Sequence, residues 1–182
     1  ALRASMTGHL VFSTLHTNDA LSATNRLTDM GVESYLVASA LKAVLAQRLI
    51  RKNCTYCVQE YEPDRSEVDW VFEQNPQFKS RRFMKGEGCS RCNKTGFSGR
   101  IGIFELLLIN ADMATAIRQE DHMGFNLLAQ QDKAYRRLYE SAMDCARQGL
   151  TTLEEVIRVA EQVEEPEHEP PAIHPTSSHA VL

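Results

Sequence analysis

The segment Gly88-Cys-Ser-Arg-Cys-Asn-Lys-Thr-Gly-Phe-Ser-Gly-Arg-Ile-Gly-Ile-Phe-Glu105 places a cysteine pair directly before an apolar, β-branched run. The pair is Cys89 and Cys92, and a second pair with the same spacing, Cys54 and Cys57, lies upstream. A Cys-x-x-Cys turn puts two thiolates on one side of a tight loop, and two such turns supply the four sulfur ligands of a tetrahedral zinc ion. The sequence therefore predicts a closed structural Zn²⁺ site with no position for substrate.

Other roles of paired cysteines remain open at this point. A redox pair and an iron–sulfur cluster use similar spacings, but two pairs separated by an insert of 31 residues favour zinc over a redox centre. We see no secretory signal, so a reducing compartment is expected, and there metal binding is favoured over disulfides. The fifth cysteine, Cys145, lies in a run with helical spacing and is interpreted as a small buried hydrophobe.

The composition is that of a globular protein, with 43% apolar and 24% charged residues. The net charge of −4 is concentrated in residues 161–182, which hold five glutamates and no Lys or Arg. The remainder has 20 basic and 19 acidic side chains, so no large basic field indicates a nucleic-acid partner. No apolar run is long enough to cross a bilayer. The chain opens at Ala1 as if within a domain, which suggests a fragment.

Apolar spacing predicts a mixed order of strands and helices. The expected strands are Leu10–Leu15, Leu45–Ile50 and Arg100–Ile109. The expected helices are Ala20–Met30, Glu33–Ala43, Ser66–Gln74, 112–119, 135–147 and a final short helix that opens with the capping box Thr151-Thr-Leu-Glu-Glu155. This alternation is typical of an α/β domain. From about Val163 the acidic, proline-rich composition predicts a disordered tail.

The segment Thr7-Gly-His-Leu-Val-Phe-Ser-Thr-Leu-His-Thr-Asn-Asp19 puts His9 before the first predicted strand and His16 at its end. In open α/β sheets, ligands bind beyond the carboxyl ends of strands, and helix N-termini favour phosphate groups. The segment is therefore a candidate phosphate-facing loop. The alternative is that His16 only ends a strand while Asn18 and Asp19 cap a helix, and the residues alone leave both open.

This segment resembles the histidine box of the bacterial secretion ATPases, the motors of type II secretion and type IV pilus assembly. Three further stretches resemble the same family, in the same order over about residues 1–160: Ala46-Gln-Arg-Leu-Ile-Arg51 with the cysteine pair that follows it, Gly88–Glu105, and Gly149-Leu-Thr-Thr-Leu-Glu-Glu-Val-Ile-Arg158. In having two cysteine pairs, the chain resembles the assembly and export branch of this family. The stretch from Arg118 to Gly149 is most similar to the ATPase of mannose-sensitive haemagglutinin pilus biogenesis.

The resemblance implies an α/β fold, a partial RecA-like P-loop NTPase core with a four-cysteine zinc subdomain and C-terminal helices. Residues 1–51 would be the C-terminal half of the ATPase core, 52–99 the zinc subdomain, 100–162 a returning strand and helical module, and 163–182 the disordered tail. His16 matches the box histidine near the γ-phosphate, and His9 matches its upstream companion. Gln47 and Arg48 match positions near the nucleotide.

The function implied is that of a homo-hexameric motor, cytoplasmic and peripheral at the inner membrane, which uses ATP and Mg²⁺ to move an inner-membrane platform protein. One departure is clear: none of the nine glycines begins a Gly-x-x-x-x-Gly-Lys-Ser/Thr loop. The chain alone is therefore expected to be inactive. The alternative is a non-enzymatic, zinc-stabilised interaction module with Lys79, Arg81 and Arg82 as its contact surface.

Overall fold

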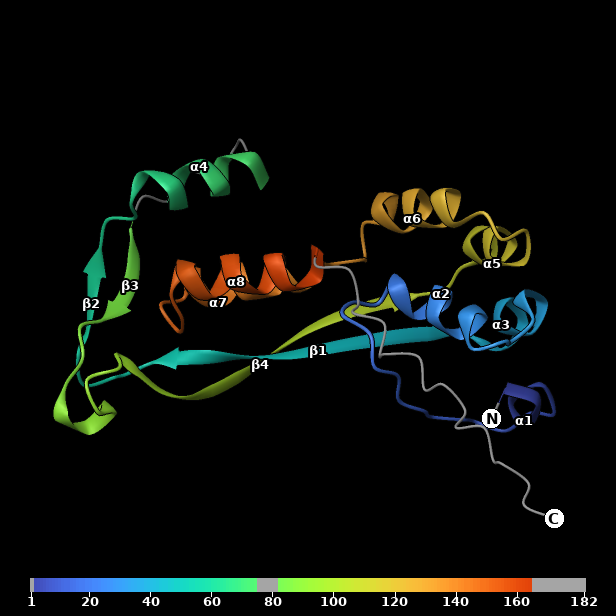
Figure 1. Ribbon diagram of the computed structural model, residues 1–182, viewed down its shortest axis with the longest axis horizontal. Coiled ribbons are helices and arrows are strands. Elements are labelled where there is room, and N and C mark those ends of the chain that lie inside the picture. Colours follow the sequence, from blue (N-terminus) through green and yellow to red (C-terminus); the bar gives the residue numbers. More distant parts are fainter. Residues whose placement is uncertain (1, 75–81, 165–182) are drawn as a thin grey trace, which may run out of the picture.

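A long antiparallel ribbon of two strands runs through the molecule, and most of the helices lie beside it (Figure 1). The computed structural model describes residues 2–74 and 82–164. Strand β1 (Ala43–Asn53) pairs with β4 (Phe97–Leu108), from Ala43 opposite Leu108 to Asn53 opposite Phe97. The second sheet is a short antiparallel pair of β2 (Val58–Tyr61) and β3 (Phe83–Gly86) at one end of the ribbon (Figure 1). Helix α4 lies in the connection between the two strands, and we call the pair the β2–β3 hairpin.

The helices fall into groups along the chain. They are α1 (Leu2–Met6), α2 (Ser22–Asp29), α3 (Ser34–Ala40), α4 (Arg65–Gln74), α5 (Ala111–Arg118), α6 (His122–Gln131), α7 (Leu138–Arg147) and α8 (Leu153–Glu164). None of the described helices combines the length and apolar character that a membrane span requires.

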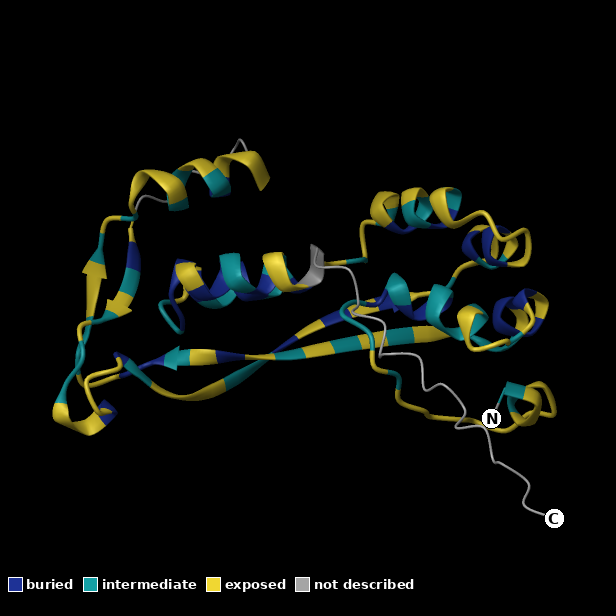
Figure 2. Cartoon of the chain, viewed as in Figure 1, coloured by how far each residue is buried: buried dark blue, intermediate teal, exposed yellow. Residues whose placement is uncertain are grey.

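Two hydrophobic clusters meet on one face of the ribbon. The first joins Ile50 and Ile103 of the ribbon to α7 and α8. The second joins Leu107 of β4 to α3, α5 and α6. Because side chains alternate along a strand, the opposite face carries a second apolar row, 46–61% exposed, formed by Leu45, Leu49, Phe104, Leu106 and Leu108 (Figure 2).

Most of the predicted elements are confirmed. The expected strands at 45–50 and 100–109 are β1 and β4, and Gly31 and Gly149 follow α2 and α7 with positive φ. Of the predicted capping box, the Thr152 hydroxyl accepts a hydrogen bond from the Glu155 backbone amide at 3.3 Å. The sequence did not predict α1, α6, β2 or β3. Helix α8 extends to Glu164, so the predicted start of the disordered tail at 163 is wrong by two residues, and the rest of the predicted tail, from residue 165 onward, lies outside the described residues.

The strand predicted at Leu10–Leu15 is wrong. These residues form neither helix nor strand, and the Leu10 and Phe12 side chains are 84% and 88% exposed. The apolar run has the composition of a buried strand, but a strand forms only against a neighbour that accepts its backbone hydrogen bonds. No segment that the structure describes pairs with this one.

Candidate metal centre and histidine loop

The four paired cysteines converge at the end of the ribbon that carries the β2–β3 hairpin. Their sulfur atoms all lie within 4.8 Å of one another. The Sγ–Sγ distances are 3.9 Å for Cys54–Cys89 and for Cys57–Cys92, and 3.8 Å for Cys89–Cys92. Zinc–sulfur bonds of about 2.3 Å in a tetrahedron give sulfur–sulfur edges of about 3.8 Å, whereas a disulfide bond is about 2 Å long. The arrangement therefore fits one tetrahedral ion and not a pair of disulfides.

Backbone amides beside the two Cys-x-x-Cys turns, which we call the first and second knuckle, point at the sulfur atoms. The amide of Gly88 donates to Cys57 Sγ at 3.3 Å, and the amides of Cys89 and Gly96 donate to Cys92 Sγ at 3.1 and 3.3 Å. The donors, led by the Cys89 amide, lower the pKa of Cys92 to about 6. Burial raises the pKa of Cys57 to about 12. N–H donors stabilise thiolates, so this backbone suits a metal held by sulfur anions.

Two glycines, Gly86 and Gly96, allow the end of β3 and the segment after the second knuckle to lie very close together. A Cβ atom on Gly96 would lie 2.3 Å from the carbonyl oxygen of Gly86, and one on Gly86 would lie 2.1 Å from that of Gly96. Gly96 also has φ of +78°, which L-residues with side chains rarely adopt. This close approach therefore needs glycine at both positions. The Gly96 carbonyl also accepts a hydrogen bond from the Cys54 amide at 2.9 Å.

Asn53 fastens the cysteine cluster to the C-terminal helices. Its backbone amide donates to the Leu150 carbonyl at 2.8 Å, and its side-chain amide donates to the carbonyls of Met84 and Gly149, both at 3.0 Å. One buried side chain next to the first cysteine thus holds β1, β3 and the α7–α8 turn together.

A buried carboxylate of α8 pairs with two half-exposed arginines close to this contact. The carboxylate of Glu155, with a side-chain exposure of 0%, pairs with Arg51 at 2.8 Å and Arg158 at 2.9 Å and also accepts the Arg51 backbone amide at 2.7 Å. Burial opposes ionisation of this group, but the hydrogen bonds from Arg158 and Arg51 outweigh it and lower the pKa of Glu155 to about 2. The Arg51 guanidinium also stacks 4.1 Å above the Phe97 ring. This network fastens α8 to the ribbon.

The histidine segment lies apart from the cysteines along the chain and is mostly exposed. His9, His16 and Gln47 are all exposed, and the His9 Nδ1 atom makes local contacts at 3.0 Å to Thr7 Oγ1 and 3.2 Å to the Ala4 carbonyl. Arg48 donates to the Asn18 side-chain oxygen at 2.8 Å. The structure therefore joins Arg48 to the loop after His16, and it brings neither His9 nor Gln47 to that contact.

The helix-capping interpretation of the loop also finds support. The Asp19 carboxylate accepts from the Ser22 backbone amide at 2.7 Å at the start of α2. Capping by Asp19 and a role of His16 toward a ligand are compatible, because His16 takes no part in the cap.

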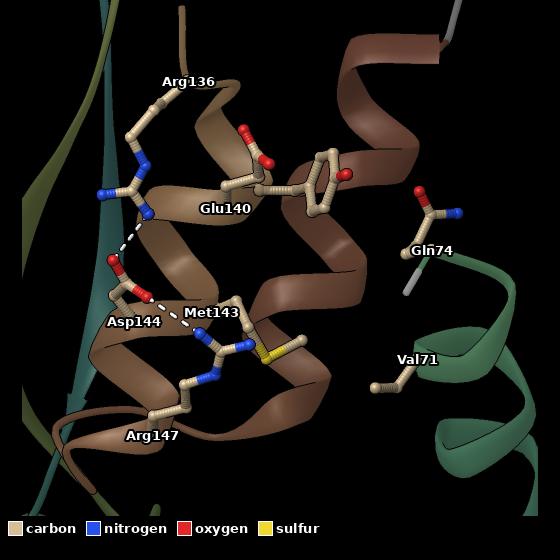
Figure 3. A pocket seen from close by; sticks show the side chains of 8 residues that line it. Val71, Gln74, Arg136, Glu140, Met143, Asp144 and Arg147 are labelled. Carbon is tan, nitrogen blue, oxygen red and sulfur yellow. Dashed lines mark hydrogen bonds and ion pairs between the residues drawn. The ribbon is translucent and has the colours of Figure 1, made fainter. Parts of the chain in front are cut away.

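The cavity drawn in Figure 3 lies between α4 and α7 and has a volume of about 150 Å³. Its wall includes Asp144, which pairs with Arg136 at 2.6 Å and Arg147 at 3.3 Å. None of the predicted site residues lines it, so it adds nothing to the metal centre or the histidine loop.

Comparison with known proteins identifies the class. The sequence pattern of the family described as type II/IV secretion system protein matches residues 1–158, and the chain belongs to that family. The chain is 41% identical over 168 residues to the type II secretion system ATPase E of Vibrio cholerae, covering 89% of this chain and 32% of the relative. It is 40% identical over 157 residues to the type IV pilus assembly ATPase PilB of Thermus thermophilus, covering 86% of this chain and 18% of the relative. The chain thus spans about a third or less of the relatives it matches.

A solved structure supports the fold. The pilus retraction motor PilT with bound ADP aligns with 87% of this chain and 34% of its own, at a TM-score of 0.54 and 23% identity. This likeness and the cysteine cluster confirm the predicted fold class, a partial RecA-like α/β core with a four-cysteine subdomain and C-terminal helices.

Proposed function

We propose that this chain forms part of a homo-hexameric motor that hydrolyses ATP to power type II secretion or type IV pilus assembly. The observation that carries the proposal is an identity of 40–44% over 86–89% of the chain with relatives named for these two systems. The motor would be cytoplasmic, peripheral at the inner membrane, and would act on an inner-membrane platform protein.

In this proposal the histidine loop and the cysteine cluster have different roles. His16 faces the γ-phosphate of ATP, His9 is its companion, and Gln47 and Arg48 lie near the nucleotide. The contact between Arg48 and Asn18 supports a shared site at this loop. The four cysteines hold a structural Zn²⁺ ion, which supplies four strong bonds and no open position for chemistry. ATP and Mg²⁺ need a phosphate-binding loop, and these 182 residues contain no Gly-x-x-x-x-Gly-Lys-Ser/Thr motif.

The test is a hybrid enzyme in which this chain replaces the matching 168-residue region of the Vibrio cholerae ATPase. We expect the hybrid to hydrolyse ATP and the isolated chain to show no turnover. His16→Ala in the hybrid should lower kcat about 100-fold with its zinc content unchanged. His122→Ala, which removes another exposed histidine, is the matched control and should keep full activity. A folded, zinc-loaded hybrid without turnover contradicts the proposal.

A second candidate is a non-enzymatic, zinc-stabilised interaction module. Of its predicted contact residues, Lys79 and Arg81 lie outside the described residues, and Arg82 pairs with Glu60 at 2.9 Å. The observation that favours a contact surface here is Tyr56, 66% exposed on the first knuckle with the Arg91 guanidinium 3.9 Å above its ring. Tyr56→Ala in the hybrid should then abolish secretion and leave ATP hydrolysis intact. Secretion at the normal level argues against this candidate.

A further inference from the structure

Glu105 is an acidic residue in the buried row of β4. Its neighbours on the same face, Ile103 and Leu107, are 0% exposed, and Glu105 itself is 2% exposed. Ile103 belongs to the cluster formed with α7 and α8, and Leu107 belongs to the cluster formed with α3, α5 and α6. Glu105 therefore lies where the two hydrophobic clusters meet.

Three donors from separate segments converge on this carboxylate. Its Oε1 atom accepts from the Ala20 backbone amide at 2.9 Å and from the Tyr135 hydroxyl at 2.7 Å. Its Oε2 atom accepts from the Leu138 backbone amide at 3.0 Å. Ala20 follows the histidine loop, Tyr135 lies in the α6–α7 connection, and Leu138 is the first residue of α7.

These hydrogen bonds fix the carboxylate. A buried carboxylate is costly unless hydrogen bonds or counter-charges compensate it. Among residues 2–74 and 82–164, no Lys, Arg or His nitrogen lies within the ion-pair distance of 4.0 Å. The three hydrogen-bond donors therefore compensate the cost of burying the Glu105 carboxylate. One of them, the Leu138 amide, lies in the first turn of α7, where backbone N–H groups have no partner within the helix. Any displacement of Ala20 or Leu138 leaves Glu105 less well satisfied.

The ribbon holds the histidine loop at two points. Arg48 of β1 binds Asn18, and Glu105 of β4 binds Ala20, so the loop between them cannot shift along the ribbon without breaking one contact. His16 lies two residues before Asn18. The position of His16 thus depends on the same carboxylate that holds the start of α7.

We propose that Glu105 is a positioning residue, which fixes the His16–Ala20 loop against α7 during the ATP hydrolysis proposed above, on which this inference rests. A shift of α7 reaches the loop through one side chain, because Leu138 and Ala20 bind the two oxygens of the same carboxylate. Glu105 touches neither nucleotide nor reacting atoms in this proposal. Its effect on turnover passes through His16.

The first experiment compares Glu105→Gln with Glu155→Gln in the hybrid ATPase. A glutamine has one acceptor oxygen and one NH₂ group, so it cannot accept from all three donors around Glu105. We expect Glu105→Gln to lower kcat about 10- to 100-fold while KM for ATP changes less than about twofold. Glu155 is an equally buried carboxylate that binds Arg51 and Arg158, so Glu155→Gln should retain kcat below its unfolding temperature.

The second experiment uses the 182-residue chain and does not need activity. The glutamine oxygen can accept either from Ala20 and Tyr135 or from Leu138, so hydrogen exchange at the Ala20 amide or at the Leu138 amide should accelerate about tenfold or more in Glu105→Gln. Local opening at these two amides should not accelerate in Glu155→Gln. Tyr135→Phe removes one donor and leaves those of Ala20 and Leu138, so it should give an intermediate effect and serves if Glu105→Gln does not fold.

The outcomes separate the two proposals. Equal kcat in the Glu105→Gln and Glu155→Gln hybrids, or unchanged exchange at both the Ala20 and the Leu138 amides, overturns the positioning role. An inactive wild-type hybrid contradicts the proposed function, and exchange at the Ala20 and Leu138 amides then still decides whether Glu105 links the loop to α7.

Discussion

The cysteine cluster at one end of the β1–β4 ribbon and the histidine loop along its length are held in different ways. At the cysteine end, all four sulfur ligands and the amides that stabilise them come from residues 54–96. The histidine loop contacts Arg48 in the middle of β1 and Glu105 of β4 through side-chain hydrogen bonds, and His9, His16 and Gln47 are exposed. The cysteines bring four possible metal ligands together within the described residues, whereas the exposed side chains of the histidine loop are not gathered into one cluster.

The largest effect should come from removing one sulfur ligand. Cys92→Ser replaces the thiolate that receives two backbone amides, and the free energy of zinc binding, on the order of 10 kcal/mol for structural sites, is also folding free energy. We expect loss of bound zinc and unfolding of the β2–β3 hairpin, with the α3–α5–α6 cluster retained. Elemental analysis and amide exchange measure both.

Cys145→Ser is the matched control for that experiment. Cys145 lies on α7 against the first hydrophobic cluster and outside the group of four sulfur atoms. The control should keep one zinc ion per chain. Loss of zinc from both variants, or retention in both, contradicts the site.

The next effect concerns the ion pair that fastens α8 beside the cysteine end. Glu155→Gln removes the counter-charge of two half-exposed arginines, Arg51 and Arg158. Because water still solvates both guanidinium groups, we expect the free energy of unfolding to fall by about 2 kcal/mol. Urea titration measures it. Glu154→Gln, which removes a half-exposed neighbour that contacts Arg51 at 3.6 Å, should cost under about 1 kcal/mol.

The same carboxyl predicts a pH dependence. Its folded pKa of about 2 lies below its ordinary value of 4.5, so the unfolded chain binds the proton more readily. The stabilisation is therefore complete above about pH 4.5 and is lost as the pH falls towards 2. Wild type should lose stability across this window faster than Glu155→Gln does. Parallel curves for the two proteins would falsify the assignment.

How much the sequence predicts also differs between these two regions. The cysteine site follows from ligand spacing, which is local, and the structure brings those residues together. The strand predicted at Leu10–Leu15 fails because pairing depends on a neighbour, which a run of apolar residues does not specify. The hairpin strands β2 and β3 have four residues each and too little pattern to detect. Helix α6 was also not predicted, because it contains Gly124, a residue that disfavours helices. In the structure the Asp121 carboxylate accepts from the Gly124 backbone amide at the start of this helix.

Glu105 shows the limit most clearly. Its sequence signal is an acidic residue that interrupts an apolar strand, and this signal was visible. Its meaning depends on Ala20 and Leu138, which lie 85 and 33 residues away in sequence. Only the fold shows that both bind the same carboxylate.

A smaller effect is expected from a substitution where Gly86 and Gly96 lie close together beside the four cysteines. Gly96→Ala places a Cβ atom 2.3 Å from a backbone oxygen, and Gly99→Ala meets nothing within 4 Å, although both residues have φ near +79°. Backbone strain alone costs about 1–2 kcal/mol, so Gly99→Ala reports that cost. We expect Gly96→Ala to lose clearly more stability and to bind zinc more weakly. Equal losses in the two variants mean that this close approach does not constrain the second knuckle.

The smallest effect should come from the exposed apolar row of the ribbon. Leu106 on β4 is 46% exposed, while Leu107, the next residue, is wholly buried in the second cluster. Leu106→Ala should change the unfolding free energy by less than about 1 kcal/mol, and Leu107→Ala should cost about 2–5 kcal/mol. Urea titration of the two variants compares the faces directly. A large loss from Leu106→Ala would mean that another surface covers this row in solution, and sedimentation of the wild-type chain would then show association.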